Sequence, residues 1–189
     1  MPDAQNESER FERAHRLIDA QDVAGLRAEL ESSPEVVGET GGPNANNLLG
    51  MATATCDERL VELLLTHGAD VAQANVHGWT ALHQGAYRGL PHLVAILREA
   101  GASVELSARG DGGTPLIVAL FWGHRAAAEA LAEPMAPRNL RAAAGLGRLD
   151  LIEELVPAGV PSPEAGRHRD FYRPHSGFPE GWRPGGEAQ

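Results

Sequence analysis

Apolar residues along this chain recur with the spacing of short helices, most clearly between residues 78 and 102. Thr80 can cap a first helix that ends at Gly89, and a second helix then runs to Gly101. The apolar positions of these two helices are Leu82, Ala86, Leu93, Val94, Ile96 and Leu97. Because two helices this short cannot bury their apolar faces alone, the pattern predicts a unit that stacks against copies of itself.

The copies are visible as a fixed spacing. Thr114 follows Thr80 by 34 residues (114 − 80), and Leu48 precedes Leu82 by the same 34 residues (82 − 48). A period in this range is typical of helical hairpins stacked into a solenoid. The spacing therefore predicts several consecutive hairpins, each of which packs only against its neighbours.

The motifs GWTALHQGAYRG (78–89), LVAILREAGAS (93–103) and GGTPLIVALFWG (112–123) are similar to ankyrin repeats. The family pattern is Gly-x-Thr-Pro-Leu-His, two small residues and glycine, followed by an apolar helix that ends in Gly-Ala. Ala81 replaces the proline and Ile117 replaces the histidine. The resemblance implies an all-α fold, an ankyrin-repeat solenoid of about four to five stacked helix-turn-helix pairs. From Ala136 onward the chain also resembles a subgroup of bacterial ankyrin proteins, so we expect a bacterial protein that is either naturally short or truncated at its C-terminus.

We divide the chain into an ankyrin-repeat domain (1–160) and an irregular tail (161–189) rich in proline, glycine and aromatic residues. The repeats are placed at about 8–34, 44–70, 75–103, 109–133 and 137–159, and some of them are divergent. We expect Ser8 to cap the first helix and the segment from Val36 to Asn47 to be a loop. We expect four tail rings to cover the open face of the fifth pair: Phe171, Tyr172, Phe178 and Trp182.

Net charge and composition exclude several classes of function. The net charge of −10 argues against a nucleic-acid or anionic-membrane partner, because neither is attracted to an acidic protein. The apolar run from Leu116 to Trp122 is far shorter than the ~20 residues needed to span a bilayer. A single cysteine, Cys56, excludes an internal disulfide framework and fits a reducing compartment. These features favour a cytoplasmic protein.

The sequence contains no convincing catalytic or metal-binding motif. A P-loop, a His-Glu-x-x-His motif, a cysteine pair and a Gly-x-Ser-x-Gly motif are all absent from it. His77 and His83 are six residues apart, which is not a ligand spacing for one helix face. The family resemblance instead implies that His83 makes a hydrogen bond between neighbouring hairpins. We therefore predict a non-enzymatic protein without cofactor or metal.

The family resemblance also implies where a partner would bind. In ankyrin repeats the partner-facing side chains lie at the finger tip, around the glycine before the threonine, and at the two positions before the mid-repeat glycine. In this sequence those positions are Val76, His77, Trp79, Tyr87, Arg88, Asp111, Phe121 and Trp122. Four of the nine Phe, Trp and Tyr residues fall among them. The corresponding second-repeat residues, Thr53 and Ala54, are small and would leave a recess beside the rings.

We interpret these rings as a concave aromatic surface that binds a protein partner. The prediction requires that the stack satisfies its own apolar needs without Trp79, Tyr87 and Trp122. An opposing interpretation has Phe121 and Trp122 packed between adjacent helices or against the tail, with Phe121 half-buried. An alternative function is a small-molecule binder or unrecognised enzyme that uses the same recess, with His77, His83 or Arg88 as polar anchors. A third is an intracellular inhibitor or immunity-type protein whose partner is an enzyme.

Overall fold

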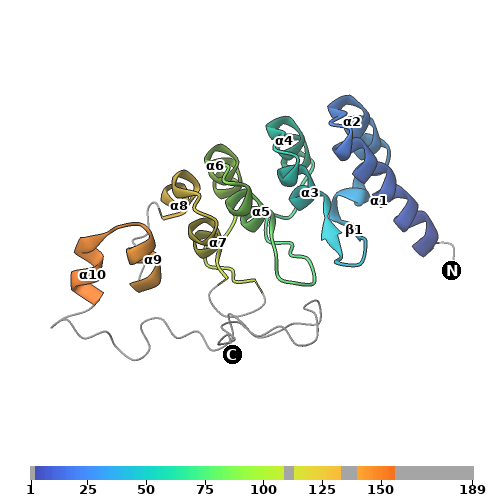
Figure 1. Cartoon of the computed structure of the whole chain (residues 1–189). Helices are drawn as coiled ribbons and strands as arrows, with labels where there is room; N and C mark the ends of the chain where they lie inside the picture. The colour runs from blue at the N-terminus through green and yellow to red at the C-terminus, as the bar shows by residue number, and fades with distance from the viewer. Residues whose placement is uncertain (1–2, 109–112, 133–139, 156–189) are drawn as a thin grey trace, which may run out of the picture.

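The computed structural model describes residues 3–108, 113–132 and 140–155 of the chain. Helices follow one another in antiparallel pairs that stack side by side (Figure 1). The first helices of the pairs are α1 (Asp3–Asp19), α3 (Leu48–Ala54), α5 (Ala81–Arg88), α7 (Pro115–Phe121) and α9 (Leu140–Gly145). The second helices are α2 (Val23–Ser32), α4 (Glu58–Thr66), α6 (Pro91–Glu99), α8 (Arg125–Ala132) and α10 (Leu149–Leu155). Helices α1, α3, α5 and α7 contact one another in order, as do α2, α4, α6 and α8, so the predicted all-α solenoid is confirmed.

Side-chain caps fix where several helices begin. The Asp22 carboxylate accepts the backbone N–H of Gly25 at 2.9 Å, and Thr80 caps α5 as the sequence predicts. The predicted N-cap at Ser8 is wrong, because α1 already begins at Asp3.

Leucines of the second helices form the centre of the core. Each of α2, α4 and α6 buries two leucines four residues apart, so both lie on one helix face. These residues, all fully buried, are Leu26, Leu30, Leu60, Leu64, Leu93 and Leu97. Burying one such side chain contributes about 1.5–3 kcal/mol. The recurring pair therefore stabilises each hairpin against the next, as stacking requires.

The segment predicted as a loop before α3 has regular structure. It contains the short 3-10 helix η1 (Pro34–Gly38) and an antiparallel hairpin of β1 (Thr40–Gly41) and β2 (Asn46–Asn47). Gly41 pairs with Asn46 in this hairpin. The prediction of an irregular loop is wrong here, because the turn closes into the extended finger between consecutive pairs. An isolated bridge between Ala108 and Gly113 marks another finger.

The last pair is less tightly joined to the stack. Helix α9 contacts α7, and Figure 1 shows α10 set apart from α8. Ala142 and Ala143 are buried, whereas Leu149 is 71% exposed. The predicted repeat boundaries stay predictions. The tail, with the four rings expected to fold back, lies outside the described residues.

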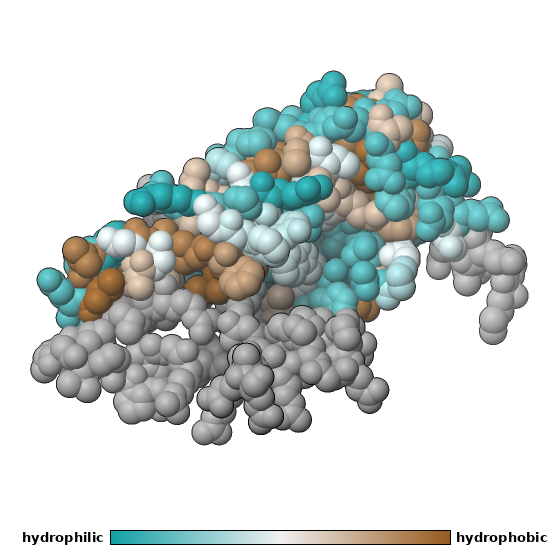
Figure 2. Space-filling view, viewed as in Figure 1, coloured by the Kyte–Doolittle hydropathy of each residue, from teal (hydrophilic) through white to brown (hydrophobic). Residues whose placement is uncertain are grey.

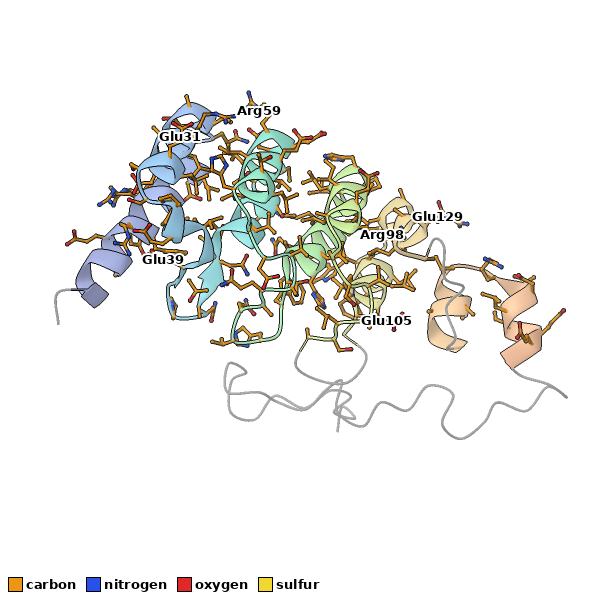
Figure 3. All side chains as sticks on the ribbon, turned by 180° about the vertical axis from the view of Figure 1, so that it is seen from behind. Glu31, Glu39, Arg59, Arg98, Glu105 and Glu129 are labelled. Atoms are coloured by element: carbon orange, nitrogen blue, oxygen red, sulfur yellow. The ribbon has the colours of Figure 1, made fainter. Side chains whose placement is uncertain are left out.

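The second helices present a charged outer surface. Figure 3 shows Arg59 of α4, Arg98 of α6 and Glu129 of α8 on this side of the stack. The Arg98 guanidinium donates to the backbone carbonyl oxygen of Ala130 on the next outer helix. Within the described ranges, no helix is long and apolar enough to cross a membrane, and no three acidic, histidine or cysteine side chains cluster to hold a metal.

Candidate partner-binding surface

Four aromatic rings of α5, α7 and the preceding finger contact one another in a row, which we call the aromatic ladder: Trp79, Tyr87, Trp122 and Phe121. The ring centroids of Trp79 and Tyr87 are 6.2 Å apart, those of Tyr87 and Trp122 5.1 Å, and those of Trp122 and Phe121 5.6 Å. All three contacts are edge-to-face, the favoured geometry of aromatic pairs. The ladder thus joins two consecutive repeats into one surface.

Exposure increases along the ladder. Tyr87 is 37% exposed, Trp122 is 53% exposed and Phe121 is 65% exposed. The expectation of a half-buried Phe121 is therefore wrong, and this exposed residue is the last one of α7. Apolar residues gather over α7, α9 and α10 on the face seen in Figure 2.

Trp79 differs from the other three rings. It is partly buried, packs against the core and lies 5.4 Å from the His83 ring. Its indole Nε1 donates to Gln84 Oε1 at 3.0 Å. We expected that the stack would not use the Trp79 ring in its own packing. That expectation is wrong, because the ring packs against the core and its hydrogen bond to Gln84 anchors the finger to α5.

The other predicted residues lie beside the ladder. Val76, at the finger tip, is 39% exposed, and Arg88 is exposed at the end of α5. His77 is partly buried, and its Nε2 lies 3.2 Å from Asn44 Oδ1 in the preceding finger. Asp111 lies outside the described residues. The structure therefore describes seven of the eight predicted residues, of which the four rings contact one another, and leaves the eighth undescribed.

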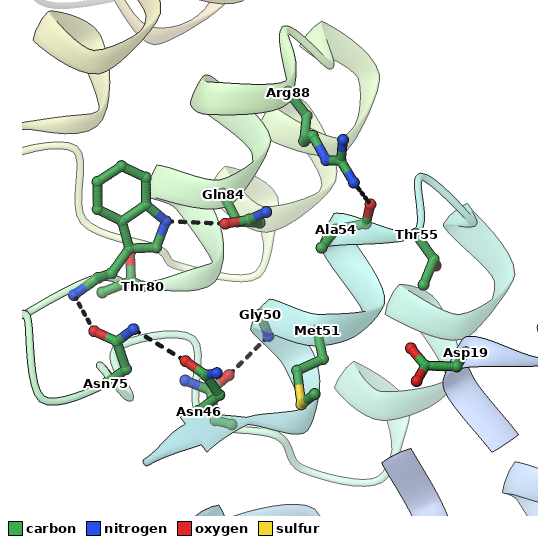
Figure 4. Close-up of a pocket in the computed structure, with 12 residues that line it drawn as sticks. Asp19, Asn46, Gly50, Met51, Ala54, Thr55, Asn75, Thr80, Gln84 and Arg88 are labelled. Carbon is green, nitrogen blue, oxygen red and sulfur yellow. Dashed lines mark hydrogen bonds between the residues drawn. The ribbon is translucent and has the colours of Figure 1, made fainter. Parts of the chain in front are cut away.

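A groove of about 400 Å³ crosses the surface next to the ladder, and we call it the central groove (Figure 4). Helices α1, α3 and α5 and the two fingers line it through Asp19, Asn46, Asn47, Gly50, Met51, Ala54, Thr55, Asn75, Trp79, Thr80, Gln84 and Arg88. A second hollow of about 380 Å³ is lined by Asn75, His77, Trp79, Gln84 and Tyr87. Trp79 lines both, so its ring stands between the groove and the outer part of the ladder.

Small residues of α3 account for the central groove. Gly50 and Ala54 lie four residues apart and both line it. The sequence suggested a recess at Thr53 and Ala54. Thr53 is instead buried, with its hydroxyl donating to the Leu49 carbonyl oxygen at 2.8 Å. Ala54 alone of the two lines the groove.

Sequence reasoning missed the amide side chains of the groove. Asn75 Oδ1 accepts the backbone N–H groups of His77 and Trp79, at 2.9 and 3.1 Å. Asn75 Nδ2 in turn donates to Asn46 Oδ1 at 3.0 Å. The signal that could have found Asn75 is its place at the start of the finger turn, because an asparagine side chain commonly accepts the backbone N–H two residues further on, as Asn75 does from His77.

His83 holds neighbouring fingers together. Its Nδ1 lies 2.8 Å from Thr80 Oγ1, and its Nε2 lies 2.9 Å from the Gly113 carbonyl oxygen. The hydrogen bond between hairpins that the resemblance implied is thus present. Burial lowers the pKa of His83 from 6.5 to about 4, so the ring is neutral at pH 7. Since both ring nitrogens are engaged, His83 is not available to anchor a ligand.

Comparison with known proteins identifies the repeated unit. The family model "Ankyrin repeats (3 copies)" matches residues 49–142. The BTB/POZ domain and ankyrin repeat-containing protein NPR1 of Malus hupehensis is 32% identical over 109 residues, which cover 57% of this chain and 18% of that protein. The ankyrin repeat and SAM domain-containing protein 6 of Rattus norvegicus is 39% identical over 80 residues, covering 42% of this chain and 9% of the relative. The Notch-regulated ankyrin repeat-containing protein of Xenopus tropicalis is 39% identical over 56 residues, covering 30% of this chain and 49% of the relative.

In each of these relatives the match covers less than half of the protein. The similarity therefore identifies the repeats and leaves the rest of each relative without a counterpart in the alignment. The expected bacterial origin stays a prediction.

Proposed function

Because this chain belongs to the ankyrin-repeat proteins, we propose that it is a non-enzymatic module that binds one protein partner through the aromatic ladder. Ankyrin repeats are generally protein-interaction modules. The surface includes the predicted residues Val76, His77 and Arg88 in addition to the four rings, and the sequence also assigns Asp111 to it, which lies outside the described residues.

The observation that carries this proposal is the exposure of the ladder's outer rings. Phe121 and Trp122 are 65% and 53% exposed although they touch each other and Trp122 also touches Tyr87. Contiguous exposed apolar area is uncommon on soluble proteins outside interaction sites. Tryptophan and tyrosine are also the residues most enriched among binding hot spots, where truncation costs about 2 kcal/mol or more.

The geometry also favours a rigid binding surface. Each ladder ring contacts its neighbour edge to face, and Trp79 is fixed by its hydrogen bond to Gln84. Rings that are ordered before association lose less conformational entropy when a partner arrives. The acidic chain, with a net charge of −10, would attract a partner whose rim is neutral or basic.

A pull-down from the native host tests the proposal. Wild type is compared with a Tyr87→Ala/Trp122→Ala double variant and with Leu106→Ala, a control whose side chain is also exposed, at 39%, but lies outside the ladder. We expect a specific protein to be retained by wild type and by the control and lost from the double variant. Equal recovery by all three would exclude the ladder as the binding surface.

The structure gives the small-molecule alternative no specific support. His83, one of its polar anchors, already uses both ring nitrogens. We therefore propose the protein-binding function alone.

A further inference from the structure

The amide of Gln84 has a fixed orientation. The indole N–H of Trp79 can only donate, so the Gln84 atom 3.0 Å from it must be the carbonyl oxygen Oε1. The amide nitrogen Nε2 then lies on the opposite side, and Figure 4 shows it directed toward the space between Arg88 and Gly50. Within the described part of the chain, Nε2 has no hydrogen-bond acceptor. Gln84 therefore presents a donor to the central groove.

The orientation of the Asn46 amide follows from the same reasoning, with Asn75 as the intermediate residue. Two backbone N–H groups, those of His77 and Trp79, donate to Asn75 Oδ1, which makes the other Asn75 atom the donor Nδ2. Nδ2 donates to Asn46 Oδ1 at 3.0 Å. Asn46, which lines the groove, is left with its Nδ2 donor unused among the described residues. Asn46 Nδ2 is thus a second donor in the groove, and its orientation is determined by groups that can only donate.

Arg88 supplies a third donor group one helical turn after Gln84. Its Nη2 donates to the Ala54 carbonyl oxygen at 2.7 Å, which holds the guanidinium across the groove (Figure 4). A guanidinium carries five N–H donors, and the others of Arg88 have no acceptor in the described ranges. The Arg88 side chain is therefore positioned and still able to bind an acceptor.

The remaining polar side chains of the groove do not remove this excess of hydrogen-bond donors. Asn47 is satisfied at both ends, by Gln73 and Gly50, and the Thr55 hydroxyl donates to the Ala52 carbonyl oxygen. Asp19, whose Oδ2 lies 3.3 Å from His15 Nε2, is the acidic residue among those that line the groove. It belongs to α1, two helices away from the donors of α5. One wall therefore offers donors and a positive charge, and the opposite end offers a negative charge.

We propose that the central groove binds an extended segment of the protein partner through an aspartate or glutamate side chain. The carboxylate accepts hydrogen bonds from Arg88 and Gln84, and Asn46 donates to a backbone carbonyl of the same segment. Trp79 and Met51 provide the apolar surface for the flanking side chains. This inference rests on the proposed function and names the chemistry that the partner must carry next to the ladder.

Asp19 sets the direction of the segment. A carboxylate at the α5 wall is favoured by Arg88, whereas a second carboxylate near Asp19 is repelled, so a neutral or basic residue belongs at that end. The net charge of −10 does not oppose this arrangement, because salt screens exposed charges beyond about 8 Å while Arg88 acts at contact distance.

A tethered peptide array tests the groove. Randomised extended peptides are attached by their C-termini, so that a terminal carboxylate is not presented, and are probed with wild type and two variants. Gln84→Glu keeps the oxygen that accepts from Trp79 and replaces the donor with a negative acceptor. Arg27→Gln is the matched control, because it changes the net charge by the same −1 at an exposed position of α2.

For wild type we expect selected peptides that share an aspartate or glutamate, with at least tenfold weaker binding when that residue becomes asparagine or glutamine. Gln84→Glu should lose these peptides by a similar factor, and Arg27→Gln should keep them. An array with no selected peptide, or selected peptides without a shared acid, would overturn the inference. Unchanged selection by Gln84→Glu would overturn it as well.

The same variants separate this inference from the proposed function. If the partner captured by the pull-down is lost by Tyr87→Ala/Trp122→Ala but kept by Gln84→Glu, the groove assignment fails and the ladder stands. If the partner is kept by Tyr87→Ala/Trp122→Ala, the ladder itself is excluded.

Discussion

The imidazole Nε2 of His83 lies 2.9 Å from the carbonyl oxygen of Gly113, thirty residues further along the chain. This contact joins the capped start of α5 to the base of the following finger. The N-caps of the ladder-bearing helices α5 and α7 are Thr80, whose hydroxyl oxygen lies 2.8 Å from His83 Nδ1, and Thr114, which follows Gly113. The surface that we propose for binding therefore depends on a buried neutral imidazole.

The first prediction concerns pH. The unfolded chain binds a proton at His83 with a pKa near 6.5, while burial lowers the pKa in the folded state to about 4. Between these values the unfolded state holds more protons, so the contribution of His83 to the free energy of unfolding is full above pH 6.5 and falls toward pH 4, by at most about 3 kcal/mol. Urea unfolding at pH 7.5 and pH 4.5 measures the difference.

His83→Gln is the control for this pH effect. Glutamine can still donate to the Gly113 carbonyl oxygen but does not titrate, so the variant should be less stable at pH 7.5 and lose less stability at pH 4.5. The same loss in variant and wild type would show that other groups cause the pH dependence.

A second prediction compares two glycines of one repeat. Gly85 lies inside α5, and a methyl group added there would meet side chains only at 3.5 Å or more. Gly85→Ala should therefore raise the free energy of unfolding by about 0.5–1 kcal/mol, because alanine has the higher helix propensity.

Gly89 is the opposite case. Its φ is +69°, and an added methyl carbon would lie 2.5 Å from His124 Nδ1. Gly89→Ala should destabilise the protein by about 1–2 kcal/mol or more, because an L side chain is strained in this backbone region. Thermal unfolding of the two variants side by side checks the opposite signs. Two shifts of equal sign would contradict the packing described for α5.

A third prediction concerns the cap of α4. The Asp57 carboxylate accepts the backbone N–H of Arg59 at 3.0 Å, and the side-chain hydrogen bond from Arg59 lowers the Asp57 pKa. Asp57→Ala should cost about 1 kcal/mol of stability, whereas Asp57→Asn should retain most of it, since asparagine is also a good N-cap. Chemical denaturation distinguishes the two. Equal losses would assign the effect to the negative charge instead of the cap.

Much of the fold could be predicted from local patterns. Thr80 with Gly89 defined a helix, and the 34-residue recurrence of Thr114 defined its copy, because capping and helical periodicity are short-range properties. The hairpin that pairs Gly41 with Asn46 was missed. Its pairing carries no periodic signal and depends on the following finger, where Asn75 Nδ2 donates to Asn46 Oδ1.

The candidate site was predicted less completely. The repeat pattern placed Tyr87, Phe121 and Trp122 on one surface, but it did not show that Trp79 is partly buried and bonded to Gln84. That difference depends on the orientation of one indole ring, which tertiary packing decides. The donors of Gln84, Arg88 and Asn46 in the groove could not be predicted either, because the orientation of an amide depends on hydrogen-bond partners that are far apart in the sequence.

Site-specific photo-crosslinking in the native host tests the central claim most directly. A photoreactive amino acid replaces Phe121, the most exposed ladder ring, and in a separate protein it replaces Leu149, which is also exposed but lies on α10. We predict a discrete covalent adduct with one cellular protein from position 121 and none of that size from position 149. No adduct at position 121, or the same adduct at both positions, would contradict binding through the aromatic ladder.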